Sequence, residues 1–411
     1  MRNKQPTLSP PEPLRGAELG TFTHHSVVNR LPEIGRRTLA GSWFPTSVAS
    51  NVDDLIESIP DGPIRHLLDS EAPDGELWRS YVEPYEGQDW LAVPWFFAET
   101  YFYRRLMEAT GYFGEIKGRS YGYGFDPFFL QKLKGFEANL ESSRGLMERL
   151  ELALKRSTPD KRTFGQLLQT GLWSNQADLS LWPVGSQEDP AHGDGDAGHS
   201  YILVDQRQEV VDNLFGRQLP APRVDFLIDN AGFELVVDLA TALYLLAAGM
   251  AEEVVLHVKA HPTFVSDAIS ADVRKTVDLL AAEENSAAAT AGSRLEKYLA
   301  SYKLRIETDF FWTSPLAMWQ MPDALREDLS KSAIVISKGD ANYRRLLGDR
   351  HWPFETPFED IVSYMPTPVL ALRALKSEVA CGLRPSQAET TAKKDPEWLT
   401  DGRWGVIQFR G

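Results

Sequence analysis

Acidic and amide side chains gather in one short segment, "DFLIDNAGFELVVDL" (225–239), where an expected strand meets an expected helix. The apolar run ends in Asp229 and Asn230, the chain turns at Gly232, and Glu234 lies in the first turn of the helix. Carboxylate and amide oxygens at such a junction suit a divalent cation such as Mg²⁺ or Mn²⁺. Taken alone, the segment is more typical of a helix cap, with Asn230 as the capping residue.

Charged side chains also follow other apolar runs of the chain. "VVLHV" leads through "KAHPTFVSD" to Asp267, and "AIVIS" is followed by "KGDANYRR", which carries Lys338 and Arg344. "VLALRAL" carries Arg373, and Lys376 comes directly after it. Because the carboxyl ends of parallel strands meet at one edge of a sheet, we expect these side chains to converge there. Singly, such basic residues are ordinary surface residues, but together they predict an anion site beside a metal site.

The expected metal ligands are Asp229, Asn230 and Asp267. With no cysteine or paired histidines nearby, oxygen ligands favour Mn²⁺ or Mg²⁺ over Zn²⁺, and Co²⁺ or Ni²⁺ are further candidates. Carboxylates crowded at a partly buried rim raise each other's pKa, and a divalent cation removes this repulsion. Glu234, at a helix N-terminus that favours anions, is the candidate general base, whereas Asp238 is expected to be a structural partner.

The composition restricts the classes of partner. The 411 residues carry 43 Lys and Arg against 58 Asp and Glu, a formal charge of −15, which argues against nucleic acid or an anionic membrane. The single cysteine, Cys381, excludes a disulfide framework and fits a reducing compartment. No apolar run approaches the roughly 20 residues of a membrane span. We therefore expect a cytoplasmic, soluble protein that binds a small phosphorylated metabolite and has no obligate protein partner.

The residue pattern differs between the two halves of the sequence, and together the two patterns predict an α/β fold with a helical N-terminal subdomain. Over 43–173, aromatic and aliphatic residues recur at helical spacing, so this half is expected to be helical with its aromatic residues in the core. After about residue 200, short β-branched runs alternate with helical patterns, which indicates a doubly wound, mostly parallel sheet. The expected strands are 224–229, 254–258, 304–308, 333–337, 369–375 and 405–409.

The predicted boundaries between the parts of the chain follow these residue patterns. One helix is expected after Asn230, and a second amphipathic stretch covers 276–302. The Gly- and Asp-rich segment after Gly185 is interpreted as a loop, and its glycine spacing is not a dinucleotide fingerprint because no strand leads into it. The predicted parts are a flexible tail (1–16), a mostly helical region (17–185), a loop (186–199) and an α/β core (200–411).

Several long segments resemble the DUF89 family of metal-dependent phosphatases, the damage-control phosphatases, and specifically its acidic residue methyltransferase 1-like subfamily. The resembling segments are "SWFPTSVASNVDDLI", "PWFFAETYFYRRL", "LWSNQADLS", "FLIDNAGFELVVDL", "VVLHVKAHPTFVSD", "FWTSP", "SKGDANYRRLLGDRHW" and "LALRALK". Together they span most of the chain. The resemblance implies a Rossmann-like α/β/α core with a helical N-terminal part packed on it.

The resemblance also implies roles for particular residues. It implies a divalent metal held by Asp229, Asn230 and Asp267. The subfamily signature Arg-Thr-x-Lys is Arg373-Ala374-Leu375-Lys376 here, so the threonine hydroxyl is missing while both cations remain. The implied sugar-phosphate contacts are Asp229, Asn230, the segment 340–344 with Asp340, Asn342, Tyr343 and Arg344, and Lys376.

The leading hypothesis is metal-dependent hydrolysis of sugar phosphates such as fructose 1-phosphate or fructose 6-phosphate, a form of metabolite damage control. Lys338, Arg344 and Lys376 would offset the charge of the transferring phosphoryl group. Attack by water and an aspartyl-phosphate on Asp229 both stay open.

Two other hypotheses compete with the phosphatase. One is S-adenosylmethionine-dependent methylation of protein glutamate carboxyls, a function also ascribed to the subfamily. However, no Gly-rich loop follows the first strand to hold that cofactor, and clustered Lys and Arg disfavour a cationic methyl donor. The other is a catalytically idle binding module, which the presence of all three expected metal ligands weakens.

Overall fold

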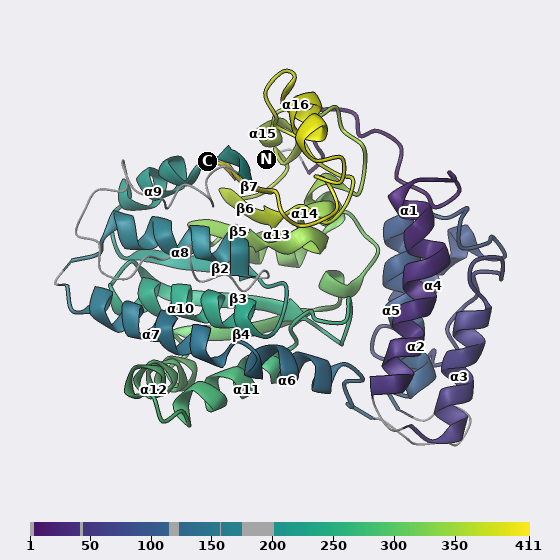
Figure 1. The fold of residues 1–411 in the computed structure, drawn as a ribbon, viewed down its shortest axis with the longest axis horizontal. Helices are drawn as coiled ribbons and strands as arrows, with labels where there is room; N and C mark the ends of the chain where they lie inside the picture. The colour runs from purple at the N-terminus through teal and green to yellow at the C-terminus, as the bar shows by residue number, and fades with distance from the viewer. Residues whose placement is uncertain (1–3, 42–43, 115–122, 157, 175–200) are drawn as a thin grey trace.

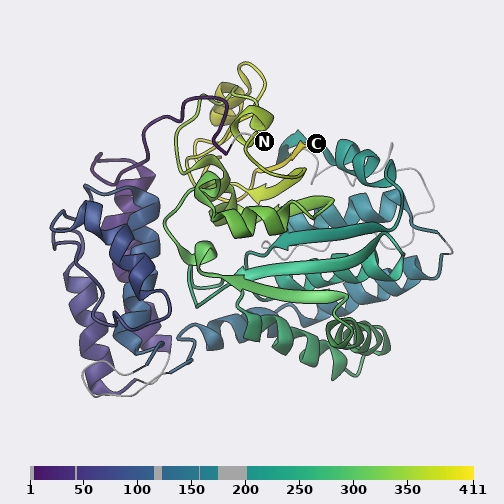
Figure 2. The ribbon, with the colours of Figure 1, turned by 180° about the vertical axis from the view of Figure 1, so that it is seen from behind.

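The computed structural model describes residues 4–41, 44–114, 123–156, 158–174 and 201–411. These residues form two parts that stand side by side, an α/β body and a bundle of helices from the first part of the chain (Figures 1 and 2). None of the helices in the described regions is long and apolar enough to cross a membrane.

A seven-stranded sheet forms the centre of the α/β body, in the order β1-β7-β6-β5-β2-β3-β4. All neighbouring strands are parallel except β6 and β7, which are antiparallel. The predicted fold class is therefore confirmed. The strands are β1 (Ile202–Asp205), β2 (Ala221–Leu227), β3 (Ala251–Lys259), β4 (Leu304–Asp309), β5 (Ile334–Lys338), β6 (Val369–Ala374) and β7 (Gly405–Arg410).

The order of the strands reverses in the middle of the sheet. From β2 the chain continues outward to β3 and β4, and then returns to β5 on the other side of β2 and continues to β6. Parallel sheets bind ligands beyond the carboxyl ends of the strands at such a reversal. All six predicted strands are present, whereas β1 was missed because it is a four-residue, partly exposed edge strand without a long apolar run.

Helices cover both faces of the sheet, each over its own apolar cluster (Figure 1). One face is covered by α6 (Phe129–Glu137), α7 (Leu140–Leu154), α8 (Lys161–Trp173), α9 (Arg207–Phe215), α10 (Phe233–Ala247), α11 (Ser270–Ala281) and α12 (Ser286–Ala300). The other carries η8 (Phe310–Thr313), η9 (Met318–Gln320), α13 (Asp323–Leu329), α14 (Gly339–Leu347), α15 (Phe358–Ile361) and α16 (Gln387–Lys394).

Two features of this packing differ from the predictions. Helices α7 and α8 pack on α10 and belong to the α/β body, although the helical region was expected to extend as one part to residue 185. The stretch 276–302 was expected to be continuous but lies in two helices. Asn285 separates them, because its side chain accepts hydrogen bonds from the first backbone N–H groups of α12. The expected loop, 186–199, lies outside the described residues.

The bundle is built around one buried helix. All 16 residues of α5 are buried, and its rings pack with those of the neighbouring helices, so the prediction that these aromatic residues form a core is confirmed. The elements of the bundle are α1 (Phe22–His25), η1 (Ser26–Arg30), α2 (Leu31–Gly41), α3 (Thr46–Glu57), α4 (Gly75–Val82), η2 (Glu83–Tyr85) and α5 (Trp95–Thr110).

The N-terminal segment connects the two parts. It runs from the region of α15 to α1 (Figures 1 and 2), and its backbone is hydrogen-bonded on both sides. Leu14 N donates to Asp349 O at 3.1 Å, and Trp95 N donates to Leu14 O at 2.7 Å. Thr7 N donates to Ser363 Oγ at 3.1 Å. This order differs from the flexible tail predicted for 1–16, because composition does not reveal such backbone pairing.

Candidate active site

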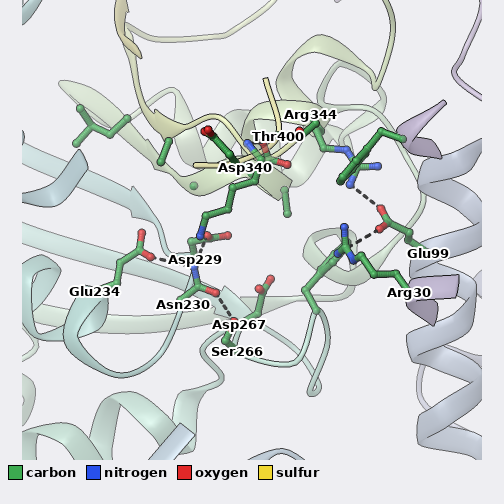
Figure 3. A pocket seen from close by; sticks show the side chains of 18 of the residues that line it. Arg30, Glu99, Asp229, Asn230, Glu234, Ser266, Asp267, Asp340, Arg344 and Thr400 are labelled. Carbon is green, nitrogen blue, oxygen red and sulfur yellow. Dashed lines mark hydrogen bonds and ion pairs between the residues drawn. The ribbon is translucent and has the colours of Figure 1, made fainter. Parts of the chain in front are cut away.

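A cavity of about 460 Å³ lies where the α/β body meets the bundle (Figure 3). Its lining includes residues that directly follow β2 and β5 and residues at the end of β6, so it is at the reversal of the strand order. The bundle supplies the opposite wall. A cavity at this position and of this size is typical of a small-molecule site.

The acidic side of the cavity is formed by two chain segments that pair after leaving the sheet. Asp229 O accepts a hydrogen bond from Ala268 N at 2.8 Å, and Ala231 N donates to Ser266 O at 2.7 Å. This short antiparallel bridge places Asn230 opposite Asp267. The structure therefore brings the three expected metal ligands together. We call these three residues and Glu234 the acidic centre, which comprises Asp229, Asn230, Glu234 and Asp267.

Hydrogen bonds orient the side chains of the acidic centre. Asn230 Nδ2 donates to Asp229 Oδ2 at 2.7 Å and to Glu234 Oε2 at 2.9 Å. On the other side of the amide, Ser266 Oγ donates to Asn230 Oδ1 at 2.5 Å (Figure 3). Asp229 Oδ1 is buried and has no hydrogen-bond partner among the described residues. An unpaired buried carboxylate oxygen is costly, so this atom is suited to bind a ligand.

The acidic centre has two lysines at its edge, but they do not balance the charge of its carboxylates. Burial, with added repulsion from Asp267 and Glu234, raises the pKa of Asp229 well above its usual value. Burial also raises the pKa of Asp267 to about 6, although the ammonium of Lys259 opposes this shift. Lys259 Nζ lies 3.3 Å from Asp267 Oδ2, but it also donates to Asn342 Oδ1 at 3.1 Å.

The side chains present fit a divalent cation with oxygen ligands. Asp229 and Asp267 supply charge, and Asn230 supplies a carbonyl oxygen. The partnerless Oδ1 of Asp229 and the raised pKa values show that the carboxylates are not compensated by the lysines. A bound cation would remove both penalties.

A second acidic group in the same sheet does not have this character. Asp225, His257 and Asp328 lie close enough to share an ion. However, the guanidinium of Arg223 donates two hydrogen bonds to Asp225, at 2.6 and 2.5 Å, and two to Asp328, at 3.0 and 2.7 Å. His257 Nε2 completes the group, 2.9 Å from Asp225 Oδ2. An internal guanidinium already pairs with both of these carboxylates.

The start of α14 closes the cavity against the acidic centre. Gly339 has a φ of +79°, and a Cβ atom on it would lie 1.9 Å from Asp229 Oδ2. Glycine is therefore required here for both the backbone conformation and the close approach of the carboxylate. The next residue, Asp340, lines the cavity and accepts hydrogen bonds from Arg373 Nε at 2.7 Å and Ser377 Oγ at 3.0 Å.

Besides Asp229 and Asn230, three of the predicted substrate contacts line the cavity, namely Asp340, Arg344 and Lys376. Arg344 is fixed on both sides, since Nη1 donates to Glu99 Oε2 at 2.5 Å and Nε donates to Asp349 Oδ1 at 2.7 Å. Lys376 is half-buried, and its ammonium group has no hydrogen-bond or ion-pair partner within the described parts of the chain. Of the predicted cations, Lys376 is thus the one that is available to a ligand.

Four other predicted contacts lie behind the cavity wall, and here the structure differs from the prediction. Lys338 Nζ is bound by Glu234 Oε1 at 2.9 Å and Asp238 Oδ1 at 3.0 Å, while Asn342 Nδ2 donates to the backbone at the end of β2. Tyr343 OH donates to Gln408 at 2.7 Å. These groups are saturated by protein partners, so they support the site from behind. The four residues are Lys338, Asn342, Tyr343 and Arg373.

The carboxylates beside Lys338 determine its charge. Burial lowers its pKa, but Asp238 and Glu234 together raise it above the usual value, so the ammonium stays charged. Burial raises the pKa of Asp238 to about 7, against the effect of Lys338. The expectation that Asp238 is a structural partner agrees with this pair.

Sequence analysis did not identify some of the residues that line the cavity. Ser266 follows β3, and the rule that strand ends meet at one rim would have indicated it. Arg30 and Glu99 come from the bundle, and no local pattern relates them to the sheet. Glu99 is buried and paired with Arg344.

Comparisons with known proteins give the family of this chain. A family model described as "Damage-control phosphatase ARMT1-like domain" matches residues 27–391. The curated protein "Damage-control phosphatase ARMT1" of Rattus norvegicus is 32% identical, over 97% of this chain and 98% of its own length. Those of Mus musculus and Homo sapiens are 33% and 29% identical, over 97% and 98% of this chain and 98% and 99% of their own lengths.

A solved structure of a DUF89 family protein from Pyrococcus horikoshii has a TM-score of 0.48 and 13% sequence identity to this chain. It covers 93% of this chain and 97% of its own, a likeness too distant to add to the assignment. The family model and the curated relatives are sufficient by themselves. This chain belongs to the ARMT1-like family of damage-control phosphatases, and it is a phosphatase.

Proposed function

We propose that this phosphatase hydrolyses small phosphorylated metabolites with the help of a divalent metal ion, and that its substrates are sugar phosphates such as fructose 1-phosphate or fructose 6-phosphate. The observation that carries the proposal is the partnerless, buried Oδ1 of Asp229, a residue that lines a cavity of about 460 Å³ at the reversal of the strand order. The one cysteine of the protein, Cys381, is buried and forms no disulfide, which suits a cytoplasmic enzyme.

Asp229, Asn230 and Asp267 would hold the ion, which we propose to be Mn²⁺ or Mg²⁺, with Co²⁺ or Ni²⁺ as substitutes. When bound, the ion supplies a Lewis acid that polarises the phosphoryl group and offsets its charge.

The protein groups around the acidic centre bind and orient the substrate. The ammonium of Lys376 is available to a phosphoryl oxygen, whereas Arg344 adds positive charge from a fixed position. Glu234 remains the candidate general base. Its Oε1 accepts from Lys338 and its Oε2 accepts from Asn230, which keeps the carboxylate turned toward the centre. Attack by water and attack by Asp229 both remain compatible with this arrangement.

The experiment measures phosphate release from a panel of phosphorylated metabolites with Mn²⁺, Mg²⁺, Co²⁺, Ni²⁺ or a chelator. Asp267→Ala should lose activity with every metal, whereas Asp278→Ala, an exposed aspartate on α11, should match the unmodified enzyme. Methyl transfer from labelled S-adenosylmethionine is measured beside it and should be absent. Full activity of Asp267→Ala, or activity that survives the chelator, would contradict the proposal.

A further inference from the structure

The wall of the cavity that faces the acidic centre comes from the helical bundle. Arg30, at the end of η1, and Glu99, on α5, both line the cavity and lie across it from Asp229 and Asp267 (Figure 3). A substrate whose phosphoryl group lies at the acidic centre therefore extends its other end toward Arg30 and Glu99. The proposed function assigns no role to these two residues.

The two side chains lie side by side but do not form a hydrogen bond with each other. Arg30 Nη2 is 3.9 Å from Glu99 Oε1, which is too long for a hydrogen bond. The other oxygen, Glu99 Oε2, accepts a hydrogen bond from Arg344 at 2.5 Å. The remaining contact of the Arg30 guanidinium to a polar side chain is a long one, 3.4 Å to Ser26 Oγ. Arg30 thus offers donors to the cavity, and Glu99 offers an acceptor beside them.

Arg30 differs in this respect from the other arginine of the cavity. Arg344 is 3% exposed, bound by two carboxylates, and stacked on the ring of Trp95 at 3.6 Å. Arg30 has 42% of its side chain exposed and one long ion pair. Arg344 is therefore part of the scaffold, and Arg30 is free to bind a ligand.

The chemistry of the pair selects one kind of ligand group. A hydroxyl oxygen both accepts and donates, so it can bind a guanidinium and a carboxylate at once. A second anionic group would be repelled by Glu99, and an apolar group would leave both side chains unpaired. We propose that Arg30 and Glu99 form a hydroxyl subsite that recognises the polyol part of a phosphorylated substrate.

The proposal rests on the proposed function, since it takes the phosphoryl group to lie at the acidic centre. It assigns the choice of substrate to the bundle and the reaction to the α/β body. A site built to hydrogen-bond hydroxyl groups discriminates against an analogue that lacks them, because a buried polar group such as the Glu99 carboxylate then loses a partner.

The test combines truncation of the substrate with truncation of the residue. Fructose 1-phosphate is compared with ethyl phosphate, a phosphomonoester without the ring hydroxyls. Arg30→Ala should lower kcat/KM for fructose 1-phosphate by about 10- to 100-fold, the effect of a lost hydrogen bond to a charged group. For ethyl phosphate the loss should stay below about threefold, because that substrate does not reach Arg30. Arg30→Lys keeps the charge with fewer donors and should give an intermediate loss for fructose 1-phosphate.

The matched control is Arg36→Ala, an exposed arginine on α2 in the same bundle that does not line the cavity. It should leave kcat/KM unchanged for both substrates, and thermal unfolding should show that all variants are folded. Equal losses for both substrates in Arg30→Ala, or no loss for either, would overturn the hydroxyl subsite alone. No phosphate release by the unmodified enzyme from either ester with any metal would overturn the proposed function itself.

Discussion

Two acidic groups lie near β2, one beside the strand and one beyond its end, and their carboxylates are compensated to different degrees. Asp225, within β2, and Asp328, on α13, share the guanidinium of Arg223, and His257 completes this closed acidic group. At the end of β2, the acidic centre around Asp229 has no such internal cation. Its two nearest lysines are also bound to other protein groups.

The difference distinguishes the candidate metal site better than the number of carboxylates does. Hydrogen bonds from Arg223 lower the pKa of Asp328 to about 2, whereas burial raises the pKa of Asp267 to about 6. Both groups contain clustered acidic residues, but only the acidic centre has a buried carboxylate oxygen without a partner, in Asp229, and a pKa shift that opposes ionisation. Buried carboxylates that lack enough positive charge are expected to bind a positively charged ligand.

The largest contrast should come from neutralising one aspartate in each group. Asp229→Asn should lower phosphatase activity by on the order of 10³-fold, since it removes an expected metal ligand. In chelator the same variant should melt at a higher temperature than the unmodified protein, because it relieves the repulsion by Asp267 and Glu234. Asp225→Asn should instead lower the free energy of unfolding by about 3–5 kcal/mol, because Arg223 loses its buried partner.

Activity assays and thermal unfolding with and without metal measure this contrast. Activity per folded molecule should be close to normal in Asp225→Asn, since that residue does not line the cavity. If Asp229→Asn were destabilised in chelator as strongly as Asp225→Asn, the two groups would not differ as described.

The next effect should come from the contact between α14 and the acidic centre. Gly339→Ala would place a Cβ atom 1.9 Å from Asp229 Oδ2 and should lower activity about 100-fold, with metal affinity weakened about 10- to 100-fold. The control is Gly249→Ala, where φ is +68° but no atom lies within 4 Å of the added Cβ. Both variants should lose about 1 kcal/mol of stability from the strained backbone. Metal titration followed by activity separates the two, and equal activity losses would show that strain alone matters.

The sequence was sufficient for the part of this site that depends on strands. Asp229, Asn230 and Asp267 converge as predicted, because continuous apolar runs identify parallel strands whose ends must share a rim. It was not sufficient for Lys338 and Arg373, which lie at the ends of β5 and β6 but turn behind the cavity wall. Whether a long side chain points into a cavity or into a buried ion pair depends on its tertiary partners, and a linear sequence does not show them.

In the bundle, too, the sequence predicts the elements but not their tertiary contacts. Its helices and aromatic core were predictable from periodicity, since α5 repeats aromatic and aliphatic residues at helical spacing. The approach of Arg30 and Glu99 to the sheet was not, because it follows from the docking of two parts over a long sequence separation. The antiparallel direction of β7 was unpredictable for a related reason, since a strand of six residues pairs equally well in either direction.

The two acidic groups should also respond oppositely to pH. In the metal-free protein, the pKa of Asp267 is raised to about 6 from a usual 3.8, so the folded state binds its proton more tightly than the unfolded state does. The free energy of unfolding should therefore fall as pH rises from about 4 to about 6, by at most about 1.4 kcal/mol per pH unit for each such group. Asp328, with a pKa lowered to about 2, adds stability that is lost as pH falls below about 4.

Urea unfolding in chelator across this pH range measures both slopes. Asp267→Asn should flatten the slope between pH 4 and 6, and Asp328→Asn should flatten the one at lower pH. Saturating metal should reduce the first slope, to which Asp238 with its pKa of about 7 also contributes, and leave the second, because the ion holds the acidic centre in its ionised form. A first slope that persists in Asp267→Asn would assign it to other groups.

The smallest effect concerns backbone strain. It occurs next to the acidic centre but not at the closed acidic group. Phe264 and Val265, just before Asp267, have φ values of +47° and +68°. The left-handed conformation is unfavourable for any residue with a Cβ and especially for a β-branched one. Asp225 and His257, in contrast, lie in regular strands.

Val265→Gly should therefore be more stable than Val265→Ala by about 1 kcal/mol, because both remove the same methyl groups and only glycine relieves the strain. The difference is measured by urea unfolding in chelator, and a glycine variant less stable than the alanine variant would show that the strain is absent in solution. If the strain holds Asp267 beside Asn230, the glycine variant should gain stability while its affinity for metal weakens. Such opposite changes are expected where a strained segment positions a functional group, and the closed acidic group should show neither.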